Sequence, residues 1–408
     1  MTTITASKTK WVETKIGDTC TVGDGAHAKI KRQAAGIIYL TSKNIKHEKL
    51  SLVNIDYISE EDFKKYFRKN SKVIKSPQID DVLLCIIGAS MGDSCFVKVK
   101  KTFGLSSSVA ILRANESILF PKYLYYWTRG YIFQDALYGI KGGAAQGYAS
   151  QEMIKSLPLN YPPLPTQCKI AAILSAYDRL IENNTRRIEI LEEMARSIYR
   201  EWFVKFRFPG HEQTQMVDSE LGLIPEGWEV GRLDDALILQ RGFDLPTQQR
   251  KEGNIPIYAS TGVTGTHNEA KVKAPGVVTG RSGSLGTVIY IDEDFWPLNT
   301  TLWVKEFRRV TPLYAFYLLS DLKLEQYNSG AAVPTLNRND IHGRLVVRPP
   351  QKLLEQLNLF VEPLLVLKKN LLKRSDNLRR TRDLLLPRLI SGEIDVENLD
   401  INTGEIAA

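Results

Sequence analysis

The sequence predicts an α+β fold: two pseudo-repeated α/β domains separated by a pair of long antiparallel coiled-coil helices. Three observations predict this class. The chain contains an internal repeat, each copy ends in a stretch with apolar residues at every seventh position, and short apolar runs alternate with glycine-rich turns before that stretch. A chain of 408 residues is also long enough for two or three domains.

The internal repeat consists of similar segments that recur in the same order. Trp11 opens Trp-Val-Glu-Thr-Lys-Ile-Gly-Asp, and Trp228 opens Trp-Glu-Val-Gly-Arg-Leu-Asp-Asp. Gly88 and Gly280 each follow an apolar run. Further matches are Ser107-Ser108 with Asn299-Thr300, Gly143-Ala144-Ala145 with Gly330-Ala331-Ala332, Ile154 with Ile341, and Pro162-Pro163 with Pro349-Pro350. Each copy is therefore expected to fold on the same framework.

The two copies differ in length between the opening tryptophan and the central glycine. The first copy is the longer one there, and its additional part includes the charged stretch from Lys43 to Lys75. The copies therefore share a framework but not a surface, as is expected if each domain recognises something different.

A seven-residue apolar period follows each Pro-Pro pair and predicts a helix-pairing seam. The seam positions are Ile170, Tyr177, Asn184, Leu191 and Ile198 in the first copy, and Leu357, Leu364, Leu371, Leu378 and Leu385 in the second. A helix of about 35 residues is roughly 50 Å long. Such a helix cannot bury its stripe within one small domain, so the two helices are expected to pack against each other.

Three residues qualify this helix prediction. Asn184 is polar within the seam, where it either sets the register of the pair or faces water. Pro363 lies inside the second period and is expected to kink that helix. Pro387 and Gly392 are expected to end it.

These patterns divide the chain into six segments. They are a first α/β domain (1–165), a first helix (166–207), a linker (208–227), a second α/β domain (228–350), a second helix (351–391) and a C-terminal tail (392–408). The tail is expected to return to the first domain, as the linker leads into the second. Strands are expected at 82–87, 95–99, 109–112, 277–278, 288–291 and 302–304, and helices at 121–131 and 312–322.

Composition limits the kind of protein. The chain is 43% hydrophobic and 25% charged, which excludes a disordered or collagen-like protein. Its formal charge of +8 favours polyanionic partners such as nucleic acid. Cys20, Cys85, Cys95 and Cys168 are widely spaced, so neither a zinc ribbon nor a disulfide framework is indicated. Neither a signal peptide nor a membrane span is expected, and we predict a cytoplasmic protein.

Several motifs resemble catalytic signatures but lack their context. Gly88-Ala89-Ser90-Met91-Gly92 fits a nucleophile elbow, yet the following residues predict a returning strand rather than a helix. Asn160-Tyr161-Pro162-Pro163 is a scrambled form of the adenine methyltransferase motif, and we interpret it as a hinge. Asp244 with Glu269-Ala270-Lys271 suggests a nuclease, but 261–267 reads as a turn where a strand is needed. The five histidines are scattered, and no P-loop occurs. No catalytic residue and no metal site are therefore predicted.

Two related domains joined by antiparallel helices have a pseudo-twofold axis, as DNA does. Domains about 50 Å apart would match roughly one to one and a half turns of duplex and could contact two different half-sites. The candidate DNA contacts are polar residues in glycine-rich loops. They are His27, Lys29, Lys31, Arg32, Ser90, Lys141, Gln146 and Tyr148 in the first copy, and Arg241, Gln248, Arg250, Lys271, Arg281, Ser284, Asn337 and Arg338 in the second.

The chain resembles the specificity subunit of type I restriction-modification systems over nearly its whole length. The motifs are the two Trp-x-x-x-x-[Ile/Leu]-x-Asp openings, the Gly-Ala-Ala segments ending in Pro-Pro, Ser197-Ile198-Tyr199-Arg200-Glu201-Trp202-Phe203, Leu223-Ile224-Pro225-Glu226-Gly227-Trp228, and Leu386-Pro387-Arg388-Leu389-Ile390-Ser391-Gly392-Glu393-Ile394. Each is weak alone, but their order is specific.

The resemblance implies two target-recognition domains that bind double-stranded DNA at a bipartite, asymmetric site, with no catalysis in this chain. It further implies docking of two methyltransferase subunits, which would bind S-adenosylmethionine and methylate adenine N6. Restriction subunits would join through that complex and use ATP and Mg²⁺ for cleavage. No cofactor is expected in this chain itself, and no individual base-contacting residue carries over from the family.

Two other functions remain open on the sequence. One is a stand-alone serine hydrolase that uses Ser90, which a serine-directed covalent probe would detect. The other is a scaffold whose two domains bind proteins and not DNA.

Overall fold

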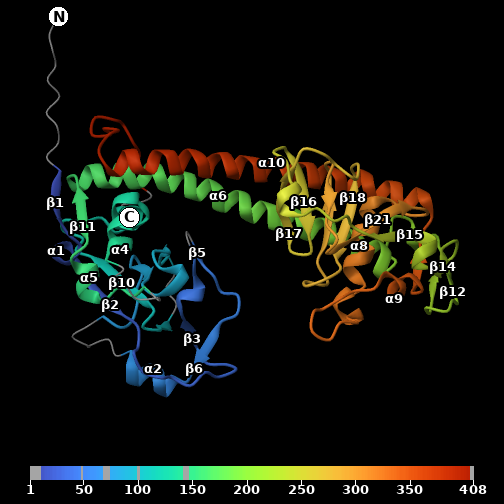
Figure 1. Ribbon diagram of the computed structural model, residues 1–408, viewed down its shortest axis with the longest axis horizontal. Helices are drawn as coiled ribbons and strands as arrows, with labels where there is room; N and C mark the ends of the chain where they lie inside the picture. Colours follow the sequence, from blue (N-terminus) through green and yellow to red (C-terminus); the bar gives the residue numbers. More distant parts are fainter. Residues whose placement is uncertain (1–10, 47–48, 68–73, 99–101, 141–146, 405–408) are drawn as a thin grey trace, which may run out of the picture. The chain divides into compact units, whose positions relative to one another are not determined.

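The computed structural model describes residues 11–46, 49–67, 74–98, 102–140, 147–404 (Figure 1). It comprises two compact units. The first unit contains residues 1–183 and 374–408, and the second contains residues 184–373. Each unit therefore consists of one α/β domain together with one half of each long helix. Among the described residues, no helix is long and apolar enough to cross a membrane.

The domain of the first unit is built on two small sheets. The larger has the strand order β2-β10-β7-β8 and is antiparallel, and the smaller has the order β6-β3-β9, with β3 and β9 parallel. A separate pair, β1 with β11, joins the start of the domain to its end. The strands are β1 (Val12–Lys15), β2 (Cys20–Asp24), β3 (Ile37–Leu40), β4 (Ile45–Lys46), β5 (Lys49–Leu50), β6 (Asp56–Ile58), β7 (Val82–Cys85), β8 (Ser94–Phe96), β9 (Phe103–Leu105), β10 (Val109–Ala114) and β11 (Pro158–Tyr161).

The domain of the second unit repeats this topology strand for strand. Its larger sheet has the order β15-β21-β18-β19, its smaller sheet the order β17-β16-β20, and β14 pairs with β22. The strands are β14 (Glu229–Arg232), β15 (Leu237–Arg241), β16 (Ile255–Ala259), β17 (Gly262–His267), β18 (Gly276–Gly280), β19 (Val288–Ile291), β20 (Trp296–Pro297), β21 (Thr301–Phe307) and β22 (Leu345–Arg348). The predicted internal repeat is confirmed.

Three helices of the first domain have counterparts in the second, whereas α4 has none. A proline at the first turn begins both α3 and α8, because proline needs no backbone N–H there. In the first unit the helices are α1 (Ile16–Thr19), α2 (Glu60–Tyr66), α3 (Pro121–Arg129), α4 (Tyr131–Gly139) and α5 (Gln151–Lys155). In the second they are α7 (Leu233–Ala236), α8 (Pro312–Asp321) and α9 (Arg338–His342). Helix α2 and the pair β4–β5 belong to the insertion in the first copy.

Two long helices, α6 (Leu164–Tyr199) and α10 (Gln351–Ile390), form what we call the stem. In the first unit, Asp178 of α6 pairs with Arg382 of α10. In the second unit, Glu192 pairs with Lys368 at 2.6 Å. Further along the chain in the second unit, Trp202 packs on Phe360, which lies earlier on α10. In the first unit, Ile170 lies earlier on α6 and shares a core with Ile390, which lies later on α10. The helices are therefore antiparallel in each unit, side by side in Figure 1. The predicted seam residues are all buried or half-buried.

Two of the expected helix breaks need correction. Helix α10 runs without interruption through Pro363, whose side chain is on the exposed face of the helix. It also continues past Pro387 to Ile390, and the chain leaves it at Gly392, which has a positive φ of 75°. A left-handed backbone of this kind is one that glycine adopts without strain.

The ends of the stem are packed in related ways. In the first unit, Val396 of the tail is buried in the core, and Lys169 donates to the carbonyl of Glu397 at 2.6 Å. In the second unit, the ring of Trp228 packs on Phe203 and Phe208. The linker between the first long helix and the second domain, residues 208–227, contains one short hairpin, β12 (Met216–Val217) with β13 (Ile224–Pro225). The tail thus returns to the first domain, as the linker leads into the second.

One predicted turn is wrong. Residues Gly262–His267 form strand β17, which pairs with β16 through a bulge. The glycines suggested a turn, but pairing with a neighbouring strand outweighs this local preference. The nuclease motif still does not assemble, because Glu269 pairs with Lys271 at 2.6 Å while Asp244 binds Asn299. In the described part of the chain, no group of three or more His, Cys, Asp and Glu side chains could hold a metal.

A buried charge cluster lies within the stem in the first unit. The guanidinium of Arg382 donates to Asp178 at 2.6 Å, and Tyr126 donates to the other oxygen of Asp178 at 2.6 Å. Arg129 lies 3.9 Å from the same carboxylate. The side chain of Arg382 is only 2% exposed, and it pairs with two carboxylates, Asp178 and the more exposed Asp383, the latter at 2.9 Å.

We predict that Asp178→Ala destabilises the first unit by about 3 kcal/mol, because it removes the carboxylate that Arg382, Arg129 and Tyr126 share in the buried cluster. Lys98→Ala is the matched control. It removes an exposed pair with Glu182 on the same helix, and should cost less than about 1 kcal/mol. Denaturant unfolding measures both, and equal losses would contradict the buried role of Asp178.

His342 makes the stability of the second unit depend on pH. Its Nε2 accepts a hydrogen bond of 3.1 Å from the backbone N–H of Leu239, which requires an unprotonated nitrogen. Burial lowers the pKa of His342 below its usual value. Its contribution to stability is therefore fully present above about pH 6.5, the pKa of an unfolded histidine, and is lost as the pH falls below that value.

We predict that the unfolding temperature of the second unit falls between pH 7.5 and pH 5, and that His342→Gln, which can still accept the hydrogen bond, reduces this fall. His211→Gln serves as the control, because His211 binds only chain neighbours, the carbonyl of Phe208 and the carboxylate of Glu212. A pH profile unchanged by His342→Gln would refute the assignment.

Candidate nucleic-acid interface

In each domain, four loops meet at one end of the larger sheet, which we call the loop end. In the first domain, Ala26 donates to the carbonyl of Leu105 at 2.8 Å, and Gly88 to that of Gly147 at 3.2 Å. In the second domain, Phe243 donates to Pro297 at 2.8 Å. Leu336 likewise donates to Arg281 at 2.8 Å. Corresponding loops are thus tied by corresponding backbone hydrogen bonds.

The close approach of these loops requires glycine at one position in each domain. A Cβ at Gly25 would collide with the carbonyl oxygen of Leu105, and a Cβ at Gly242 with that of Leu298. Backbone cannot move away as a flexible side chain can. The two glycines therefore fix where the polar side chains that flank them emerge.

The first domain has a buried carboxylate at its loop end. Asp24 is 2% exposed at its side chain and accepts a hydrogen bond from Lys75 at 2.7 Å and another from His27. Burial by itself would raise the pKa of Asp24, but these hydrogen bonds outweigh it and hold the pKa below its ordinary value. Asp24 thus stays charged and orients His27, whose side chain is 57% exposed.

The remaining basic candidates of this loop are exposed. Lys29 and Lys31 face solvent. The guanidinium of Arg32 lies 4.0 Å above the ring centre of Tyr39 and 3.4 Å from Asp56. Asp56 also binds Lys43 at 3.1 Å. Lys43 and Lys75 belong to the insertion and were not among the predicted contacts, because only the fold brings them to the side chains of the loop end.

Ser90 is a loop residue and not a nucleophile in an elbow. It lies in a single 3-10 turn, Gly88–Ser90, between the antiparallel strands β7 and β8. Within the described chain, no hydrogen bond joins its hydroxyl to a histidine. Tyr148 is 43% exposed and bridges to Ile87 in the same loop cluster. Lys141 and Gln146 fall outside the described residues.

The loop end of the second domain carries a different polar set. Arg241 lies 3.5 Å from Asp244, whose carboxylate accepts a hydrogen bond from the amide of Asn299. Arg281 donates to the carbonyl of Asn299 at 3.2 Å. A shallow hollow is lined by Arg241 and Arg338 together with Gln240, Gly242, Phe243, Asp244 and Lys305. The fold thus brings Arg241, Arg281 and Arg338 together, and adds Asn299 and Lys305, which the sequence did not single out.

The other candidates of the second domain lie elsewhere or have structural contacts. Arg250 donates to the carbonyl of Thr264 on β17 at 3.3 Å. Lys271 lies 4.7 Å from the ring centre of Trp296. Asn337 caps α9 by accepting from the backbone of Asn339 at 3.1 Å. Gln248 and Ser284 are exposed.

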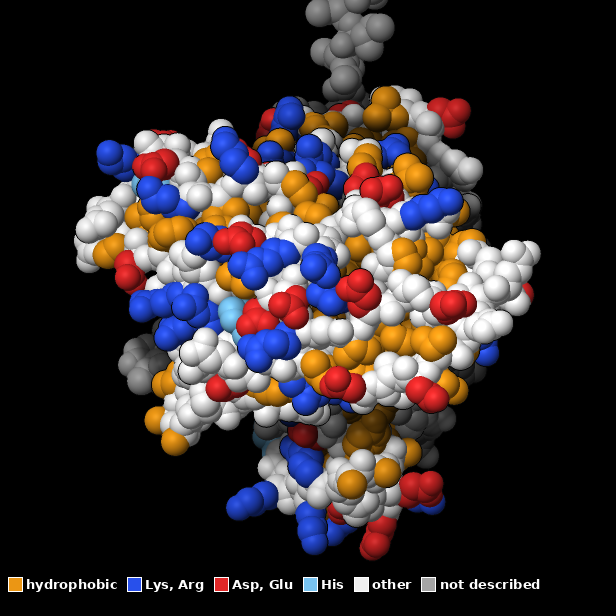
Figure 2. All heavy atoms as spheres, turned by 90° about the vertical axis from the view of Figure 1, so that its right-hand side faces the viewer, with side chains coloured by type: hydrophobic (Ala, Val, Ile, Leu, Met, Phe, Trp, Pro, Cys, Tyr) orange, Lys and Arg blue, Asp and Glu red, His pale blue; other side chains and the backbone are white. Residues whose placement is uncertain are grey.

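Basic side chains elsewhere in the second unit are mostly paired. Arg309 and Arg348 both bind Glu229, at 3.2 and 3.0 Å. Arg232 binds Asp234 at 2.8 Å. Figure 2 shows Lys and Arg interspersed with Asp, Glu and apolar side chains on one face of the molecule, without a continuous basic field. On this face, the basic side chains do not gather into one field.

The comparisons with known proteins agree with this architecture. The family model described as type I restriction modification DNA specificity domain matches residues 8–193 and 225–343. The MjaIX specificity subunit of Methanocaldococcus jannaschii, a type I restriction enzyme subunit, is 29% identical over 303 residues, covering 68% of this chain and 70% of the relative.

Two further proteins are similar over more of the chain. The putative MjaX specificity subunit of the same organism is 24% identical over 404 residues, covering 92% of this chain and 91% of the relative. The crystal structure of the S subunit of a type I restriction-modification system from M. genitalium has a TM-score of 0.59 at 16% identity, covering 94% of this chain and 97% of that one. The family model matches more than half of the sequence, and the chain belongs to the type I restriction-modification DNA specificity family.

Proposed function

We propose that the two domains bind the two parts of one bipartite, asymmetric DNA site, each with the loop end of its larger sheet. The observation that carries this proposal is the combination of a shared framework with different polar groups. Where the first domain has Asp24 and His27, the second has Arg241 and Asp244. The arginine of the second domain favours guanine, whereas the first domain offers a histidine that a carboxylate orients. The two domains would therefore select different base sequences.

We propose that this chain contributes recognition, while partner subunits carry the chemistry. Two methyltransferase subunits would bind S-adenosylmethionine and methylate adenine, and restriction subunits with ATP and Mg²⁺ would cleave. The described residues support this division of labour through what they offer for contact: polar loops on the domains and a helical stem that presents apolar side chains.

The exposed apolar side chains of the stem are the proposed docking surface for the methyltransferase subunits. On α6 they include Ile190 and Met194, which are 51% and 48% exposed. On α10 they include Leu359 and Val366, which are 74% and 60% exposed. Apolar side chains exposed in such number on a helix are typical of an interface with another protein.

We predict that Arg241→Ala weakens binding of the assembled complex to its DNA site by about 10- to 100-fold, because one arginine on a base edge is worth about 1–3 kcal/mol. Arg309→Ala is the matched control, because Arg309 lies in the turn after β21, at the opposite end of that strand from the loop end. Fluorescence anisotropy over a salt series measures both. An equal loss for the two variants would refute a sequence-reading role for Arg241.

We also predict that the two domains can be altered independently. Mapping methylated adenines in cells that carry the wild-type chain should give a two-part motif. His27→Ala should relax one part only, and Arg241→Ala the other part only. A single undivided motif, or methylation by the purified chain alone, would disprove the proposed function.

A further inference from the structure

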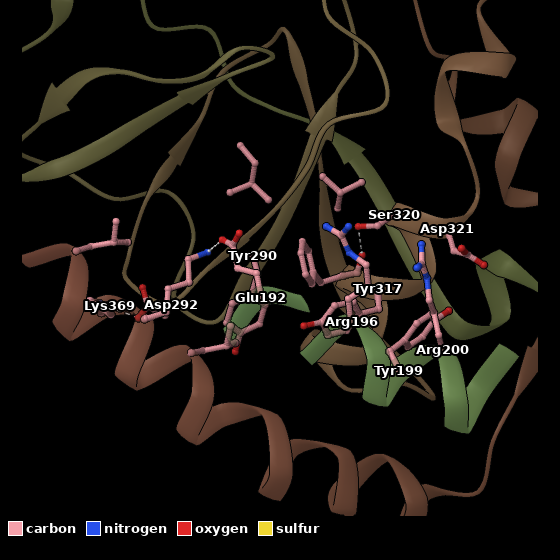
Figure 3. Close-up of a pocket in the computed structure, with 16 residues that line it drawn as sticks. Glu192, Arg196, Tyr199, Arg200, Tyr290, Asp292, Tyr317, Ser320, Asp321 and Lys369 are labelled. Carbon is pink, nitrogen blue, oxygen red and sulfur yellow. Dashed lines mark hydrogen bonds and ion pairs between the residues drawn. The ribbon is translucent and has the colours of Figure 1, made fainter. Parts of the chain in front are cut away.

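A cavity of about 650 Å³ lies within the second unit, between the stem helices, strand β19 and helix α8 (Figure 3). Aromatic rings of Tyr199, Tyr290 and Tyr317 form part of its wall. Two arginines four residues apart also line it: Arg196 is on α6, and Arg200 begins the π-helical turn Arg200–Val204 that follows α6. Figure 3 shows both guanidinium groups near Tyr317, Ser320 and Asp321. None of the predicted DNA contacts belongs to this cavity.

Buried side chains occupy the corresponding place in the first unit. Helices α3 and α8 align through Tyr123 and Tyr314, whose hydroxyls donate to the carbonyls of Asn160 and Val347, at corresponding positions of β11 and β22. The stem helices align through the seam, Ile170 with Leu357. This alignment gives a counterpart for each residue of the buried cluster in the first unit. Tyr126 corresponds to Tyr317, Arg129 to Ser320, Asp178 to Leu365 and Arg382 to Ala195.

This comparison explains why the second unit is hollow. A serine and an alanine replace two arginines, so much of the volume that fills the first unit is missing. Leu365 replaces Asp178, so the carboxylate that neutralises the arginines is missing too. Tyr317 retains the position of Tyr126 but lines an open space.

The charges around the cavity leave cations in excess. Lys368 pairs with Glu192 at 2.6 Å, and Lys369 with Asp292 at 2.7 Å. Among the described residues, neither Arg196 nor Arg200 forms an ion pair or a side-chain hydrogen bond. Asp321 on the rim offsets one of these two charges and leaves the other.

We propose that this cavity binds an acidic peptide segment of a methyltransferase subunit, with one carboxylate between Arg196 and Arg200 and an apolar side chain against Phe316, Tyr317 and Leu365. The partner would then supply what the first unit builds from its own chain, a carboxylate and buried volume. The inference rests on the proposed function, because it names a contact within the proposed complex.

The lining favours a peptide over DNA. Four basic and three acidic side chains line the cavity, so one positive charge is in excess. One carboxylate matches that excess, whereas the several charges of a phosphate backbone would exceed it. A single carboxylate can approach the two arginines from the open side, as carboxylates bind arginine in protein interfaces. The aromatic walls also suit an apolar side chain.

A double variant can fill the cavity with the side chains that occupy this place in the first unit. Ser320→Arg with Leu365→Asp reproduces Arg129 and Asp178 in the full-length chain. We expect binding of the cognate methyltransferase subunit to weaken at least tenfold, and native mass spectrometry to show loss of one of two copies. Thermal unfolding and DNA binding of the variant chain verify that it folds.

A second pair of variants keeps the cavity open. The double variant Arg196→Gln with Arg200→Gln should weaken binding of the methyltransferase subunit at least tenfold. Arg186→Gln with Arg187→Gln, which removes two exposed charges from the same helix, is the control and should have less than a twofold effect.

The outcomes separate the two proposals. If the wild-type chain binds no methyltransferase subunit, the proposed function fails. If the wild-type chain binds it and folded cavity variants bind it equally well, only the cavity assignment fails. If these variants weaken binding to a DNA duplex while assembly is unchanged, the cavity contacts nucleic acid and the peptide proposal is overturned.

Discussion

The structure depends on the apolar seam between α6 and α10. In the first unit, Ile170 and Leu174 of α6 share one core with Leu389 and Ile390 of α10 and with the strands of the domain. In the second unit, Ala195 and Trp202 share a core with Leu357. Neither domain has a complete core without a helix from a distant part of the sequence. The first unit therefore cannot finish folding until the last helix has been made.

Apolar contacts favour pairing but specify direction weakly, and the polar groups provide that direction. Asp178 meets Arg382 in one unit, whereas Leu365 and Ala195 occupy the related positions in the other. Pairing of either helix with a copy of itself would bury an acid or an arginine without its partner, which is costly. The same difference explains why one unit is closed at this place and the other hollow.

The sequence predicted the framework better than the site. Periodicity and repeated segments were sufficient for the two domains and the paired helices, because the burial of many residues determines those features. Strand β17 was missed, since its pairing with β16 is a tertiary effect. The cavity was missed as well, because the presence of Ser320 and Ala195 where the first unit has Arg129 and Arg382 has meaning only once the two units are superposed. Lys75 was missed because it reaches Asp24 from far along the chain.

The loop ends are held together by backbone hydrogen bonds and by close approach at Gly25 and Gly242. Such bonds do not depend on which side chains the loops carry. Exposed positions such as Lys29 and Lys31 can therefore change at little cost in folding free energy. A lineage carrying this scaffold can acquire new target preferences by stepwise point substitution, without rebuilding its interior.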